Sequence, residues 1–138
     1  MAANSRLAVA AHIVSVLASK RDQFVNSAYV AASVNTNPVV IRRILAALTR
    51  AGIVASEKGK SGGSKLVRCP DEISLWDLSQ ALGEEHLFAI HKNPANPQCP
   101  VSCHMKEALG RAFAGAEKAA QDRLKKVTVK ELLGASAR

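Results

Sequence analysis

The chain has 138 residues, 48% of them hydrophobic and only 4% aromatic, with a formal net charge of +8. This length supports one compact core with an appended element and excludes two large domains. No apolar run approaches the ~18 residues of a membrane span, and three cysteines, an odd number, predict no disulfide framework, so we expect a cytoplasmic protein.

The excess positive charge lies in one half of the chain. Residues 1–70 contain ten Lys and Arg against two acidic residues, whereas residues 71–138 contain nine of each. This asymmetry favours contact between the N-terminal half and a polyanion. The alternative is a solvated basic face with no binding role.

Two short helices are expected first. One covers residues 5–18, with Ser5 as its N-cap, and its spacing predicts an inner face of Leu7, Ala10, Ala11, Val14 and Leu17. A signal-peptide apolar region is the alternative there, but His12 in its middle favours a core helix. The second helix covers residues 27–34, with Ser27 as its N-cap.

A third helix is predicted over residues 38–51, because Pro38 suits the first helical position and Gly52 supplies a left-handed stop. Its apolar side consists of Val40, Ile41, Ile44, Leu45 and Leu48. The opposite side consists of Val39, Arg42, Arg43, Ala46 and Arg50.

A β-hairpin should follow, with arms at residues 53–55 and 65–68 and a basic tip at 58–64 whose glycines let the backbone approach a sugar-phosphate chain. A helix followed by a basic, glycine-tipped hairpin is typical of a recognition helix and wing that bind double-stranded DNA. The predicted DNA-contacting residues are Ser27, Asn37, Val39, Arg42, Arg43, Arg50, Lys58, Lys60, Ser61, Gly62 and Lys65.

The remaining elements are a helix over residues 73–82 capped by Ser74, a loop, a long helix over 100–127, and a short helix over 129–133 capped by Thr128. The long helix carries a seam at steps of three and four that suits a second long helix and so a homodimer. Packing against the first helix of the same chain is the alternative. The seam consists of Met105, Leu109, Ala112, Phe113, Ala116, Ala120, Leu124 and Val127.

The predicted fold class is therefore mainly α with a small β-hairpin wing: a winged helix-turn-helix at residues 1–82, then a loop, a long C-terminal dimerisation helix and a closing helix at 83–138. Residues 33–82 resemble the winged-helix regulators of the Rrf2 family, typified by IscR, NsrR and CymR. The similar segments are RAGIV (50–54), KGKSGG (58–63), ISLWDL (73–78) and VTVKEL (127–132).

Within that family the chain is most similar to the YwnA-like branch, which lacks the three-cysteine cluster motif, through residues 5–10, 35–40 and 96–101. The resemblance implies a homodimeric cytoplasmic DNA-binding protein, usually a repressor. Two copies related by a two-fold axis would read a pseudo-palindromic operator. No nucleophile–base–acid set or phosphate loop indicates an enzyme.

Cys99 and Cys103 are the candidate redox-sensing residues, because a cap at Cys99 places both thiols in the first turn of the long helix, where the helix dipole favours the reactive thiolate. The response would be to oxidants or electrophiles, through an intersubunit disulfide or a mixed adduct rather than an intrahelical bond. Two inert cysteines are the alternative. A further alternative is control by a protein partner around residues 83–98 or by a small ligand.

The resemblance also raises the iron–sulfur cluster that some relatives carry. Here only Cys99 and Cys103 precede the long helix; His12 and His104 could complete a mixed set, although a helix-one histidine is also common in a core. We therefore expect no cofactor and no metal site. Cys69 is expected to be small and buried, and His86 and His91 to be loop residues without a role.

Overall fold

The computed structural model describes residues 5–84 and 86–136. These residues confirm a mainly helical chain with one two-stranded antiparallel hairpin. In chain order the elements are α1 (Arg6–Ser19), α2 (Ser27–Val34), α3 (Pro38–Arg50), β1 (Val54–Glu57), β2 (Gly63–Leu66), the 3-10 turn η1 (Pro70–Glu72), α4 (Leu75–Ala81), α5 (Pro100–Leu124) and α6 (Val129–Ser136).

Helix α1 is the centre of the core, because α2, α3, α4, α6 and strand β2 all pack against it. Ala10, Val14 and Leu17 are buried as predicted, but Leu7 and Ala11 are only half-buried and Ile13, absent from the predicted face, is fully buried. A helix enclosed on several sides has no single apolar stripe, which is why its spacing gave an incomplete face. Truncating a fully buried side chain of this core, such as Leu48→Ala, should cost about 2–5 kcal/mol.

Side-chain caps fix the starts of the helices that follow. Asn26, not Ser27, caps α2: its Oδ1 accepts a hydrogen bond of 2.8 Å from the Tyr29 amide, and Ser27 is the first helical residue. The prediction of a Ser27 cap was wrong because asparagine one residue earlier provides the same acceptor. Ser5 occupies the N-cap position of α1 but makes no side-chain cap bond.

The later caps agree with the sequence. Ser74 and Asp77 form a reciprocal capping box at α4, and the Thr128 hydroxyl accepts a hydrogen bond of 3.2 Å from the Glu131 amide in α6. These two caps lie beside each other in space, because Ser74 and Thr128 form an isolated antiparallel bridge. The bridge joins the start of α4 to the turn between α5 and α6.

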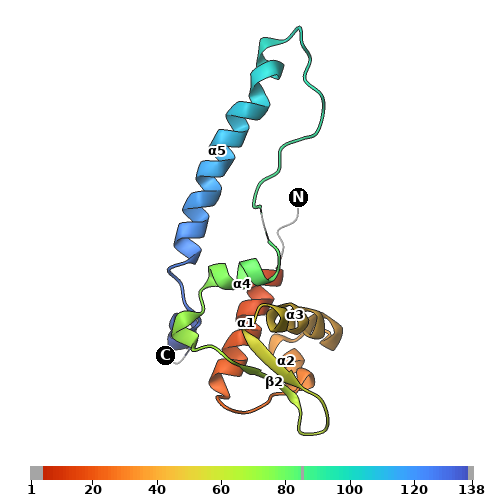
Figure 1. Ribbon diagram of the computed structural model, residues 1–138, viewed down its shortest axis with the longest axis vertical. Coiled ribbons are helices and arrows are strands. Elements are labelled where there is room, and N and C mark those ends of the chain that lie inside the picture. Colours follow the sequence, from red (N-terminus) through yellow and green to blue (C-terminus); the bar gives the residue numbers. More distant parts are fainter. Residues whose placement is uncertain (1–4, 85, 137–138) are drawn as a thin grey trace.

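The long helix α5 projects from the globular part, and residues 86–98 run alongside it before the chain turns at the far end (Figure 1). α5 ends at Leu124, three residues before the predicted end at Val127, because residues 125–128 leave the helix to pair with the start of α4. The Leu75 amide donates to the Val127 carbonyl at 2.9 Å, and the Val129 amide donates to the Ile73 carbonyl at 2.9 Å. Among the described helices, none has the length and apolar character needed to cross a membrane.

Candidate nucleic-acid interface

Helices α2 and α3 form a helix-turn-helix whose turn depends on two asparagines. Asn35 ends α2 in the left-handed conformation with a φ of 64°, which asparagine tolerates better than most residues. Asn37 begins α3, where its Oδ1 accepts a hydrogen bond of 2.8 Å from the Val39 amide. The predicted contact residue Asn37 is thus a helix cap, while its side chain stays exposed at the N-terminus of α3.

The two faces of α3 separate apolar from basic residues. Ile41, Ile44, Leu45, Ala47 and Leu48 are buried, whereas Val40, predicted on this face, is 38% exposed. The opposite face is open: the side chains of Arg42, Arg43 and Arg50 are exposed and make no hydrogen bond or ion pair with the described residues. Guanidinium groups without internal partners are available to bind phosphates or the edges of guanines.

The paired residues of the hairpin lie closer to its tip than the predicted arms do. β1 and β2 pair from Val54↔Leu66 to Glu57↔Gly63, which leaves residues 58–62 as the tip. β2 extends this far because its other edge also pairs: Val25 and Ser64 form an isolated antiparallel bridge. The tip presents Lys58, Lys60 and Ser61 as exposed side chains.

The glycines of the hairpin serve the protein's own packing. A Cβ on Gly62 would lie 2.1 Å from the Glu57 carbonyl oxygen, and one on Gly63, whose φ is 148°, would lie 2.3 Å from the Val25 carbonyl oxygen. Only Gly59, with a φ of 108°, faces open space. Two of the three glycines expected to face a sugar-phosphate chain therefore allow backbone to approach backbone inside the fold.

Three hydroxyl groups connect the recognition helix to the wing. The Thr49 hydroxyl donates to the Leu45 carbonyl at 2.8 Å and lies 3.3 Å from the Ser56 hydroxyl, which in turn lies 3.2 Å from the hydroxyl of buried Ser64. The chain of hydroxyls holds β1 and β2 at a fixed distance from α3. These contacts were not predictable from the sequence, because serine and threonine at these spacings carry no signal until the strand register is known.

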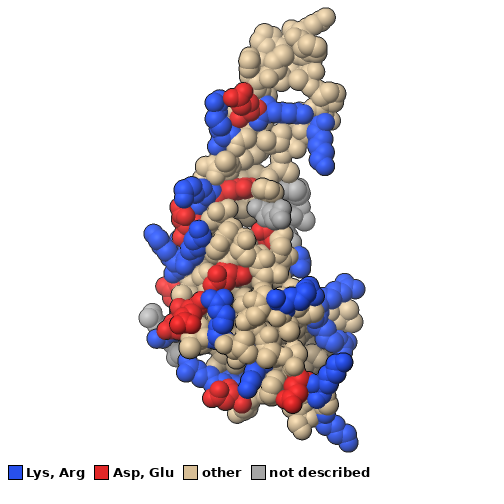
Figure 2. Space-filling view, viewed as in Figure 1, with Lys and Arg blue, Asp and Glu red and all other residues tan. Residues whose placement is uncertain are grey.

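A groove lies between α3 and the wing, and the start of α2 contributes to it. Its lining includes Ser27, Arg42, Glu57, Gly59 and Gly62, so the structure brings together residues from three separate segments. Lys and Arg side chains gather on the same side of the globular part, over α3 and the hairpin (Figure 2). Positive charge beside such a groove favours contact with the sugar-phosphate backbone of a duplex.

Two further basic residues lie against aromatic rings at the edge of this surface. Lys65 is half-buried, with its Nζ 4.8 Å from the centre of the Phe24 ring, so its ammonium is less free than those of the tip lysines. Lys20 lies 5.4 Å above the ring of Tyr29, which is 49% exposed on α2. Tyr29 is an additional candidate for contact with the DNA backbone. The only sign of this in the sequence was the presence of one aromatic residue among the small residues of α2.

The predicted seam of α5 is divided between two environments. Phe113 stacks on Phe88 of the same chain with ring centres 5.1 Å apart, while Ala120 and Leu124 line a small cavity with Trp76. Leu109 is half-buried, and Met105, Ala112 and Ala116 remain exposed at helical spacing. No described residue of α5 is buried, and the helices that pack on α1 are α2, α3, α4 and α6.

Glu117 of α5 holds the segment beside it. Its carboxylate accepts hydrogen bonds from the amides of Leu87 and Phe88 at 3.0 and 3.2 Å, and one oxygen lies 3.2 Å from Nδ1 of His86. The bond with His86, followed by that from the Phe88 amide, lowers the pKa of Glu117 below its usual value. His86, expected to be a loop residue without a role, therefore has a defined contact, although its side chain, like those of His91 and His104, is exposed.

The cysteines lie in two separate regions. Cys99 is the N-cap of α5 with Pro100 at the first helical position, as predicted, and the Cys103 thiol lies 3.5 Å from the Asn96 carbonyl oxygen. Cys69 was expected to be buried but is exposed, because it follows the wing at the surface rather than entering the core. His12 is likewise exposed, 3.0 Å from the Ser33 hydroxyl, and not a core residue.

The comparisons with known proteins cover almost the whole chain. Residues 3–135 match a family model described as "Rrf2: Iron-dependent Transcriptional regulator". The chain is 41% identical over 131 residues to the "Putative HTH-type transcriptional regulator YwnA" of Bacillus subtilis (strain 168), covering 94% of this chain and 96% of that one.

Two solved structures share the fold. One, described as a "putative transcriptional regulator" from Lactobacillus plantarum, has a TM-score of 0.85 and 26% identity, covering 97% of this chain and 91% of that chain. The other, described as a "putative DNA binding protein", has a TM-score of 0.74 and 33% identity, covering 94% and 99%. These matches confirm the winged-helix fold and the resemblance inferred from residues 33–82.

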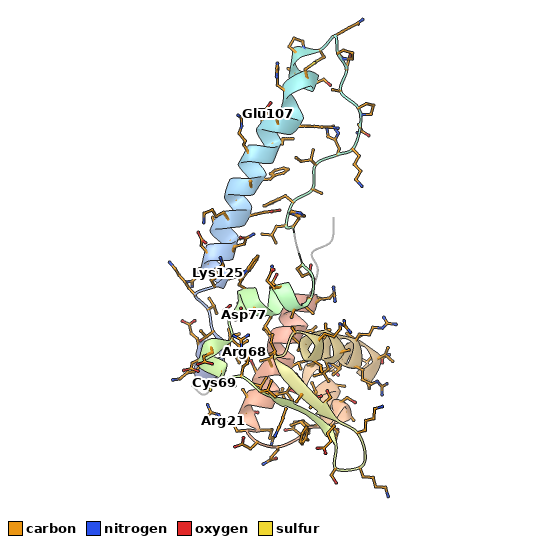
Figure 3. All side chains as sticks on the ribbon, viewed as in Figure 1. Arg21, Arg68, Cys69, Asp77, Glu107 and Lys125 are labelled. Atoms are coloured by element: carbon orange, nitrogen blue, oxygen red, sulfur yellow. The ribbon has the colours of Figure 1, made fainter. Side chains whose placement is uncertain are left out.

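The family description mentions iron, so we tested whether the side chains fit an iron site. Within residues 5–84 and 86–136, no group of three or more His, Cys, Asp or Glu is placed to hold a metal ion. Cys99 and Cys103 lie at the start of α5, whereas Cys69 lies in the globular part (Figure 3) and His12 lies beside Ser33. The donors among the described residues do not fit a cluster.

Proposed function

This chain belongs to the Rrf2 family of transcriptional regulators, a non-enzymatic DNA-binding family, and from that premise we propose that it is a homodimeric, sequence-specific DNA-binding repressor of the cytoplasm. α3 would enter the major groove with Asn37, Val39, Arg42 and Arg43. The tip lysines Lys58 and Lys60, with Arg50 and Lys65 at the edge, would bind the flanking phosphates.

The observation that carries the proposal is the set of exposed arginines on α3, none of which has a partner among the described residues, beside the lysine tip across one groove. The hydrogen bonds of Asn37 and of the Thr49–Ser56–Ser64 hydroxyls fix the start of α3 and the wing, and they leave the arginine side chains of α3 directed to solvent. This arrangement supports phosphate neutralisation together with base reading.

The dimer is supported by the exposed part of the α5 seam. Met105, Ala112 and Ala116 lie on one face, and small residues there allow two helices to approach closely. A two-fold axis through the crossing helices would present two copies of α3 to successive major grooves, about 34 Å apart. A pseudo-palindromic operator follows from that symmetry.

The signal we propose is oxidation or alkylation of Cys99, with Cys103 beside it. Cys99 begins α5, four residues from Cys103 and away from the DNA surface, so a change in its thiol acts on the proposed dimer helix rather than on the recognition helix. The geometry of a regular helix start, with the Cys103 amide donating to the Cys99 carbonyl at 3.1 Å, favours an adduct or an intersubunit bond over an intrahelical disulfide.

The proposal is tested with DNA from the region upstream of the gene that encodes this chain. Footprinting should show one protected, pseudo-palindromic segment, and light scattering should give two protomers per duplex. The double variant Arg42→Ala/Arg43→Ala, with an unchanged circular dichroism spectrum, should lose the footprint. A complex with one protomer, or a footprint retained by the double variant, contradicts the proposal.

A further inference from the structure

A cavity of about 280 Å³ lies between the end of α1 and the segment that joins the wing to η1. Its apolar wall is made of Leu17, Leu66 and Pro70, and its polar wall includes Arg21 and Arg68. Figure 3 shows Arg21, Arg68 and Cys69 on one flank of the globular part, away from α3. The cavity is therefore separate from the groove proposed to bind DNA.

The charge on this wall favours an anion. Arg21 makes no hydrogen bond or ion pair with the described residues. Arg68 is held at one nitrogen, which donates to the Glu72 carbonyl at 2.7 Å and lies 3.6 Å from a carboxylate oxygen of Asp77. Asp22 also lines the cavity and Asp77 pairs with Arg68, so two carboxylates match the two arginines. Arg21 alone has no partner among the described residues, and a single free guanidinium suits a monoanion better than a dianion.

The apolar wall selects an organic ligand rather than an inorganic ion. Leu66 is half-buried and Val67 is 53% exposed, so these two lining residues supply most of the hydrocarbon that a ligand can reach. The volume is at the lower end of the range for small-molecule sites, which are mostly apolar with a few polar groups that fix orientation. Guanidinium groups bind carboxylates through paired hydrogen bonds.

We propose that this cavity binds a small organic monocarboxylate, with its carboxylate held by Arg21 and Arg68 and its apolar part against Leu66 and Val67. A carboxylate at Arg68 competes with Asp77. Because Arg68 follows β2 and Asp77 belongs to α4, this competition acts on the connection between the wing and the α4–α5 part. The effect on DNA rests on the proposed function, whereas binding itself does not.

Ligand binding can be measured through the reactivity of Cys69, because this exposed residue lines the same cavity. The chain has three cysteines, so the double variant Cys99→Ser/Cys103→Ser leaves Cys69 as the only thiol. Its alkylation by neutral iodoacetamide is followed with benzoate or the neutral analogue benzamide at equal ionic strength. At about 10 mM, above the millimolar Kd expected for so small a ligand, benzoate should slow alkylation at least about threefold. Equal rates without ligand and with benzoate, or equal slowing by benzamide, overturn the site.

Arg21→Gln in the same background should abolish the protection by benzoate. Arg111→Gln is the matched control, since it removes the same charge from an exposed position on α5, and it should keep the protection. Protection retained by Arg21→Gln contradicts the assignment of the carboxylate.

The coupling has a separate readout: benzoate should change the affinity of the wild type for its operator at least about threefold. An unchanged affinity contradicts the coupling. A protein that protects Cys69 but binds no operator at all contradicts the proposed function instead.

Discussion

Val25 and Ser64 form a two-way backbone bridge, in which the amide of each donates to the carbonyl oxygen of the other at 2.9 Å. Val25 lies between α1 and α2, and Ser64 is the second residue of β2. The wing is thereby attached at its outer edge to the helix-turn-helix, in addition to the hydroxyl contacts from Thr49 to Ser56 and Ser64. Its orientation relative to α3 is set by both connections.

Gly63→Ala should break this attachment, because the added Cβ would lie 2.3 Å from the Val25 carbonyl oxygen. We expect a loss of about 2 kcal/mol in the free energy of unfolding, measured by urea denaturation. Gly115→Ala is the control, since a Cβ there meets nothing within 4 Å on an exposed helix; its stability should be unchanged or slightly higher. Equal unfolding midpoints for the two variants would show that the close approach is unimportant.

Ala116→Glu should convert the proposed dimer to monomers. Ala116 is exposed in the protomer, so the fold tolerates glutamate, but in the dimer each carboxylate would be desolvated at the helix crossing. The dimer Kd should rise at least about 100-fold, as measured by sedimentation equilibrium. Ala114→Glu makes the same change on another face of α5 and should remain dimeric. The dimer model fails if both variants sediment alike.

Cys99→Ser should abolish the proposed response to oxidants. Hydrogen peroxide should lower the operator affinity of the wild type by about tenfold or more, while the Cys99→Ser protein keeps its affinity. Cys69→Ser is the control, because it removes another accessible thiol and should respond like the wild type. Release of Cys99→Ser by peroxide at the wild-type concentration would rule out Cys99 as the sensor.

Glu117→Ala should free residues 86–88 from α5, since one carboxylate accepts both backbone amides. The Leu87 and Phe88 amides should exchange with solvent at least about tenfold faster by NMR. Glu107→Ala, on the same helix but with a 72% exposed side chain, should leave their exchange unchanged.

The same contact has a defined pH dependence. Because the pKa of Glu117 is lowered, the ionised carboxylate stabilises the contact at and above the ordinary glutamate value of 4.5, and this stabilisation is lost as the pH falls through the lowered pKa. Protection of the Leu87 amide should therefore persist at pH 5 to 7 and disappear in stronger acid, as the pH falls through the lowered pKa of Glu117. Protection that instead grows on acidification would contradict the assigned sign.

The fold and the outward face of α3 were predictable because they depend on local signals. The spacing of Ile41, Ile44 and Leu48, the proline at position 38 and the glycine at position 52 determine α3 whatever surrounds it. The charge difference between the two halves placed the basic surface. Family resemblance then agreed with these signals along nearly the whole chain.

Features that depend on distant neighbours were not predictable in the same way. The exposure of Cys69 depends on how the chain leaves the wing, and the displaced hairpin depends on the pairing of Ser64 with Val25. The whole α5 seam was assigned to a partner, although Phe113 stacks on Phe88 and Leu124 lines a cavity with Trp76 of the same chain. Helical spacing identifies an apolar face but not the segment that covers it.

The central claim is that α3 reads sequence while the wing tip binds phosphate, and operator binding across a salt series tests it most directly. Arg43→Ala should weaken operator binding by about 1–3 kcal/mol and non-specific binding far less. Lys60→Ala should weaken both and reduce the salt slope by about one unit. Arg111→Ala, which removes an exposed charge from α5, should behave as the wild type. Identical affinities and salt slopes for wild type, Arg43→Ala and Lys60→Ala would contradict the claim.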